Sequence, residues 1–200
     1  MSDLQHRRYI GGGAALSALT RWEADEAAAE LTGAKSGQTT RIAADFTPQV
    51  RSQSVVAAQL LNDKEVKEIT GFDGNFETGP LGDEPDTSAY SSQHFKALGR
   101  PQSFDIALRL WKLSADGAEK RYADITELLP KVDKVNEIAD QSFRASEGSI
   151  FAVGFLDRRL GAVLMLTCGQ AQCDSEEAVV KLARTAHESL KRLMPAKGTK

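Results

Sequence analysis

Two apolar segments near the C-terminal end of this sequence limit its possible folds more than any other feature. Residues 149–156 and 160–168 are separated only by the charged triplet Asp157-Arg158-Arg159. Side chains alternate between the two faces of a strand, and both faces of these segments are almost wholly apolar. Strands of this kind lie inside a sheet that is covered on both sides. The sequence therefore predicts a central antiparallel hairpin with a tight polar turn.

A long helical pattern follows this hairpin and ends near Leu193. Asp174 or Ser175 provides the capping signal, and Glu176 and Glu177 lie where the helix dipole favours negative charge. Its apolar residues form one stripe: Ala178, Leu182, Ala186, Leu190 and Leu193. We expect this helix to cover one face of the hairpin.

The rest of the chain predicts an α+β fold, in which helices pack on an antiparallel sheet. Its expected segments are a helix over 14–31, a linker over 34–54, a helix over 55–70, a loop over 72–89, strands over 90–95 and 103–113, a turn over 115–117, a helix over 118–129 and a polar connection over 131–148. We expect residues 1–54 to form an N-terminal arm with one helix and a linker. Residues 55–200 are expected to form the sheet domain.

The charge balance makes nucleic acid an unexpected partner. The chain has 28 acidic and 25 basic residues, well mixed, and a formal net charge of -3. Nucleic-acid binding proteins usually concentrate basic residues on one surface. No apolar run reaches the roughly 18 residues that a membrane-spanning helix needs, so we expect no such helix.

The two cysteines, Cys168 and Cys173, lie close together in one loop that contains a glycine. A disulfide across this loop would join the end of a strand to the start of the last helix. The alternative is two reduced, partly buried thiols. The histidines show no ligand spacing to these cysteines, so we expect no metal site or cofactor.

Known catalytic motifs are missing from the sequence. There is no Gly-x-Ser-x-Gly, phosphate-binding loop, His-Glu-x-x-His or dinucleotide fingerprint. His187 stands in the last helix beside Glu188, where packing is the more common role. We therefore expect a non-enzymatic protein. The alternative is an enzyme whose site is assembled from scattered residues such as His94, Asp105 and Arg109.

Four residues are candidates for contact with a protein partner. Trp22 lies on the predicted alanine-rich helix, and tryptophan is favoured at interaction hot spots. Trp111 belongs to the strand face expected to be partly exposed, where it either lines a ligand groove or packs under a helix. The sheet domain is expected either to dock on a larger assembly or to hold an apolar ligand. Arg158 and Arg159 form the tip of the hairpin, as a solvated turn or as a site for an anionic partner.

One segment, 60–71, resembles the start of bacterial extracytoplasmic sensor and lipoprotein domains, such as the extracellular domain of mycobacterial receptor kinases. It is a Leu-Leu helix that ends in Thr-Gly. Residues 140–143, 151–154 and 178–193 resemble the closing half of those domains, and the layout over 55–194 is similar to the Mog1/PsbP-like fold. The resemblance implies a binding or accessory role without catalytic residues.

The resemblance also implies a location in the periplasm or cell envelope. Arg7-Arg8, followed by a short apolar segment, matches a twin-arginine export signal weakly, and the alternative is a flexible arm. The sequence has no lipobox cysteine near its N-terminus and lacks the several disulfides of the family. The cytoplasm is therefore the alternative location. We expect an accessory subunit that docks on a larger assembly, or an exported sensor or ligand-binding domain.

Overall fold

The computed structural model describes residues 54–82, 84–99, 106–135 and 138–194. In these residues, seven antiparallel strands form one sheet in the order β1-β2-β3-β7-β6-β5-β4. The strands are β1 (Phe76–Gly79), β2 (Tyr90–Ala97), β3 (Ile106–Lys112), β4 (Asp133–Val135), β5 (Gln141–Glu147), β6 (Ile150–Asp157) and β7 (Ala162–Gly169). The helices are η1 (Ala57–Gln59, a 3-10 turn), α2 (Asp63–Thr70), α3 (Ala115–Leu128) and α4 (Glu176–Leu193). The predicted α+β class is confirmed.

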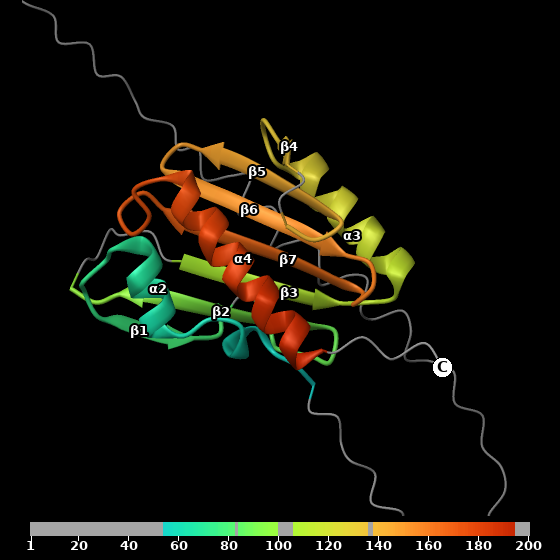
Figure 1. Cartoon of the computed structure of the whole chain (residues 1–200), viewed down its shortest axis with the longest axis horizontal. Coiled ribbons are helices and arrows are strands. Elements are labelled where there is room, and N and C mark those ends of the chain that lie inside the picture. The colour runs from blue at the N-terminus through green and yellow to red at the C-terminus, as the bar shows by residue number, and fades with distance from the viewer. Residues whose placement is uncertain (1–53, 83, 100–105, 136–137, 195–200) are drawn as a thin grey trace, which may run out of the picture.

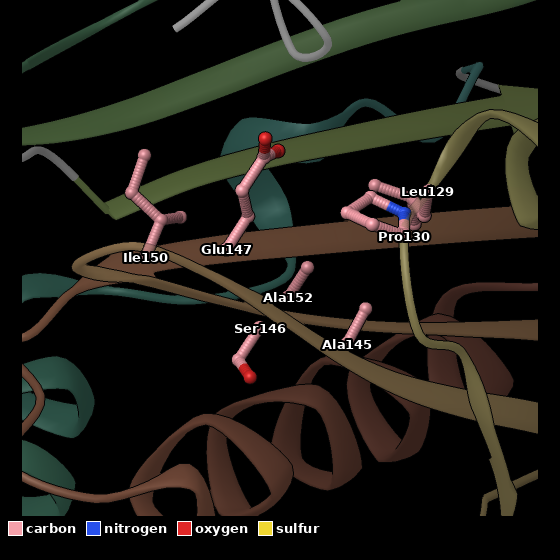
Figure 2. A pocket seen from close by; sticks show the side chains of 7 residues that line it. All are labelled: Leu129, Pro130, Ala145, Ser146, Glu147, Ile150 and Ala152. Atoms are coloured by element: carbon pink, nitrogen blue, oxygen red, sulfur yellow. The ribbon is translucent and has the colours of Figure 1, made fainter. Parts of the chain in front are cut away.

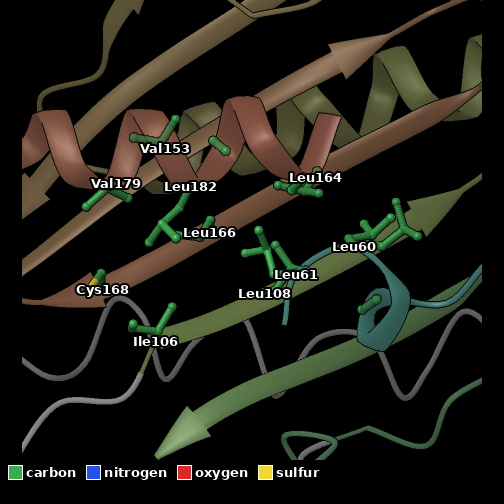
Figure 3. Packing of buried hydrophobic residues seen from close by; sticks show 14 of the residues in the cluster. Leu60, Leu61, Ile106, Leu108, Val153, Leu164, Leu166, Cys168, Val179 and Leu182 are labelled. Atoms are coloured by element: carbon green, nitrogen blue, oxygen red, sulfur yellow. The ribbon is translucent and has the colours of Figure 1, made fainter. Parts of the chain in front are cut away.

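Helices cover the sheet from both sides (Figure 1). Helix α4 crosses one face beside α2, and α3 lies behind the opposite face, towards one end of the sheet. On the α4 face, Leu164 and Leu166 of the sheet and Leu182 of the helix are fully buried, and Figure 3 shows them packed together with their neighbours. A second cluster, which includes Tyr122 and Phe143, fills the space under α3.

The predicted central hairpin is confirmed as β6 and β7. All eight residues of β7 are buried, because it lies between β3 and β6 and has helices over both faces. In β6, Gly154 leaves room for the ring of Phe143 on the neighbouring β5. A Cβ at this position would lie 2.4 Å from Phe143 Cε1 and 3.0 Å from the carbonyl oxygen of Leu164.

The polar segments contain three strands where the sequence predicted none. Strand β1 lies in the expected loop 72–89, and β4 and β5 lie in the expected connection 131–148. These two predictions are wrong. Backbone pairing with β2 and β6 holds β1 and β5 in the sheet, while a few apolar side chains such as Phe76 and Phe143 reach the core.

Two helix boundaries also differ from the prediction. Residues 55–70 form η1 and α2 rather than one helix, because Asn62 starts α2 with a capping box in which its side chain and that of Glu65 each bond the other's backbone N–H. Gly71 ends α2 as expected, with φ 70°. The predicted turn at 115–117 is instead the first turn of α3, where the Ser114 hydroxyl accepts the Gly117 N–H.

The structure joins Cys168 and Cys173 in a disulfide bond, which is the bond that the sequence suggested. Both residues are fully buried. The bond joins the end of β7 to the segment that precedes α4. None of the described helices is both long and apolar enough to cross a membrane.

Candidate functional site at the turn between β6 and β7

The β6–β7 turn (residues 157–161) begins with a buried carboxylate. Strand alternation places Asp157 on the α4 face, after Val153 and Phe155. Its Oδ2 atom lies 2.9 Å from Nε2 of His187 on α4, and its Oδ1 atom accepts the Leu160 N–H at 3.0 Å. Asp157 and His187 are only 6% and 8% exposed, so the pair is shielded from water.

The next residue ties the turn to two further elements. The backbone N–H of Arg158 donates to Asp140 Oδ2 at 2.7 Å, just before β5. Its side chain donates through Nε to Glu119 Oε1 on α3. The hydrogen bond to Glu119 raises the pKa of the Arg158 guanidinium. The turn is therefore held by α4, by α3 and by the segment before β5.

Arg159 follows Arg158 at the tip and is exposed. In contrast to its neighbour, it makes no ion pair or hydrogen bond with any residue that the structure describes. Gly161, with φ 62°, closes the turn by donating its N–H to the Arg158 carbonyl. The result is a fixed turn from which one guanidinium extends into solvent.

The Asp157–His187 pair has the composition of an acid–base dyad. Its His187 ring packs against Phe155, with 4.8 Å between the ring centroids. Among the described residues, no serine, threonine or cysteine shares a hydrogen bond with His187, and no group of three or more potential metal ligands occurs. In this geometry, the pair links α4 to the end of β6 and orients the turn.

The structure places Trp111 under α3. Its indole is 5% exposed and lies 5.0 Å below the Arg121 guanidinium and 5.5 Å from the Tyr90 ring. The expectation of a partly exposed face at this residue is therefore wrong, because α3 covers that end of the sheet. Of the four predicted partner contacts, Arg158 and Arg159 lie together, and Trp22 lies outside the described residues.

Two residues of the alternative catalytic set lie on one face of the sheet. His94 pairs with Ala107, and Arg109 pairs with Ser92, so their side chains are diagonal neighbours on β2 and β3. Asp105 lies outside the described residues. This juxtaposition follows from strand register.

The buried pair was not predicted from the sequence, although one signal for it exists. Asp157 continues the inward-facing series of Val153 and Phe155, and a carboxylate in such a position needs a buried partner. His187 lies 30 residues later, and only the path of α4 over the sheet brings the two together. No local pattern pointed to Glu119 or Asp140 as partners of Arg158.

Comparisons with known proteins give one weak likeness. No protein-family model matches the sequence, and no curated protein matches it. Among solved structures, the chain is similar to a GTP binding regulator from Thermotoga maritima, with a TM-score of 0.38 and 10% sequence identity. The alignment covers 65% of this chain and 90% of the other. A likeness this weak carries no argument about function.

Proposed function

We propose that this chain is a non-enzymatic accessory or binding subunit that docks on a larger protein assembly. The observation that carries the proposal is the fixed β6–β7 turn, from which Arg159 extends without a partner among the described residues. Arginine is enriched at interaction hot spots, and a turn that is already ordered loses little entropy on binding. Its guanidinium suits a carboxylate on the partner. Trp22 in the N-terminal arm is the second proposed contact.

Replacing Arg159 with glutamate is expected to weaken docking without changing the fold. The tagged full-length chain is expressed in its native organism and cross-linked, and the co-purified proteins are quantified by mass spectrometry. We expect the R159E variant to recover its specific partner at least tenfold less well, which corresponds to about 1.4 kcal/mol. Trp22→Ala should also lower the recovery of this partner.

Lys181→Ala provides the matched control, because Lys181 is an exposed cation elsewhere, on α4. This variant should recover the partner as the unmodified chain does. Equal recovery by the Arg159, Trp22 and Lys181 variants would contradict the proposed docking surface.

A second candidate function is an exported sensor or ligand-binding domain in the periplasm or cell envelope. The disulfide between Cys168 and Cys173 favours it, since such bonds persist in oxidising compartments and are rare in the cytosol. The resemblance of residues 55–194 to extracytoplasmic domains points the same way.

Thiol labelling in cells tests this location. Cells are quenched with acid, and the denatured chain is treated with a polyethylene glycol maleimide. Because Cys168 and Cys173 are the two cysteines of the sequence, an exported chain should gain no adduct until it is reduced, and then gain two. Two adducts without prior reduction would place the chain in a reducing compartment.

A further inference from the structure

A small pocket lies at the opposite end of β6 from the β6–β7 turn, where the β5–β6 hairpin meets the end of α3. We call it the notch; its lining residues are Leu129, Pro130, Ala145, Ser146, Glu147, Ile150 and Ala152. Figure 2 shows Glu147 between Ile150 on one side and Leu129 and Pro130 on the other. The cavity volume of the notch is about 10 Å³, which is room for one water or one small polar group.

The notch contains one charged side chain, Glu147. Its Oε2 atom is buried and has no hydrogen-bond partner among the described residues. A buried acceptor without a partner is unfavourable, and more so when it is charged. The rest of the lining is mostly apolar. The notch therefore suits a ligand group that combines a cationic donor with an apolar stem.

In the described part of the chain, strand pairing stops short of the sheet edge beside the notch. Strand β4 pairs only with residues 142–144 of β5. Upstream of β4, Lys131 has φ 51°, which turns the chain away from the strand direction. No described strand therefore pairs with the outer side of Ser146 and Glu147, so none of the described strands separates an extended partner segment from the notch.

We propose that the notch binds a lysine side chain of a protein partner. The ammonium group donates to Glu147, and the alkyl stem packs against Pro130 and Ile150, as lysine stems commonly do on apolar surfaces. The negative charge of Glu147 is complementary to the positive charge of the lysine ammonium group, and this complementarity favours lysine as the occupant. The inference rests on the proposed function in taking the partner to be a protein. It concerns a separate surface, because the eight residues of β6 place the notch about 26 Å from the β6–β7 turn.

The probe for this proposal is the capped tripeptide acetyl-Ala-Lys-Ala-amide, titrated into the 15N-labelled full chain at low salt. We expect saturable shifts of the amide signals of Gly148, Ser149 and Ile150. The same peptide with norleucine in place of lysine keeps the stem and lacks the charge, so it should bind at least fivefold more weakly. Equal binding of the two peptides, or no binding of the lysine peptide, would overturn the proposal.

Glu147→Gln and Glu127→Gln form the matched pair of variants. Both remove one negative charge, and Glu127 is an exposed residue of α3 that does not line the notch. E147Q should lower the affinity for the lysine peptide at least fivefold, and E127Q should leave this affinity within twofold of that of the unmodified chain. An equal loss in both would show a non-specific charge effect and contradict the notch. Arg159→Glu should leave peptide binding unchanged. This variant therefore distinguishes a failure of the lysine-binding proposal from a failure of the proposal that Arg159 docks on a partner.

Discussion

Replacing Gly154 with alanine is expected to lower the free energy of unfolding by about 1–3 kcal/mol, the usual cost of overpacking a core. The new methyl group would lie 2.4 Å from Cε1 and 2.6 Å from Cζ of Phe143. The Phe143 ring is fully buried and packs against Tyr122, with 5.7 Å between ring centroids, so it has little room to move aside. Urea unfolding followed by circular dichroism measures the change.

A double-mutant cycle identifies the ring as the cause. Phe143→Leu alone should be destabilising because it leaves a cavity. When Gly154→Ala is added to Phe143→Leu, the further loss should be smaller than in the unmodified chain, with a coupling energy above about 0.5 kcal/mol. Strict additivity of the two changes would contradict a clash between this methyl group and the ring.

Replacing Asp157 with alanine is expected to lower the free energy of unfolding by about 3 kcal/mol. The change removes two hydrogen bonds and leaves His187 Nε2 and the Leu160 N–H without their acceptor. Because His187 is buried on the inner face of α4, water replaces the lost carboxylate poorly. Thermal and urea unfolding of the variant measure the effect.

Two comparisons test the structural role of this pair. Asp140→Ala removes an exposed carboxylate that also serves the turn, and it should cost much less than Asp157→Ala. The combined change Asp157→Ala and His187→Leu should be less destabilising than the sum of the single changes, because neither buried polar group is then left alone. If Asp157→Ala costs no more than Asp140→Ala, the pair does not hold α4 to the turn.

The middle of the fold was predictable because the apolar pattern of its side chains shows which segments are buried. Residues 149–156 and 160–168 are almost wholly apolar on both faces, which is typical of strands covered from both sides, and they supply most of β6 and β7. The apolar stripe after Ser175 likewise predicted α4. Strands β1 and β4 lie at the sheet edges, where backbone pairing suffices and few side chains are buried, so no apolar pattern marked them.

The candidate site was predictable only where its parts are close in sequence. Cys168 and Cys173 are five residues apart, and their disulfide was anticipated. Arg158 and Arg159 were recognised as a turn. The sequence did not show that Arg158 is paired with Glu119 while Arg159 has no partner among the described residues. That difference depends on where α3 places Glu119, which is 39 residues from Arg158. Contacts of this kind follow from the packing of whole elements rather than from local pattern.

Strand β7 is the last strand in the sequence but lies in the middle of the sheet, so the sheet cannot be completed until β7 has been synthesised. A ribosome delivers the chain from its N-terminus at about 5–20 residues per second, so β7 emerges after every other strand. Until then, β1-β2-β3 and β4-β5-β6 are separate ladders, and the inner edges of β3 and β6 lack their neighbour. Such bare edges recruit strands from other chains. We therefore expect a nascent chain that stalls before Ala162 to aggregate more readily than a chain that contains β7.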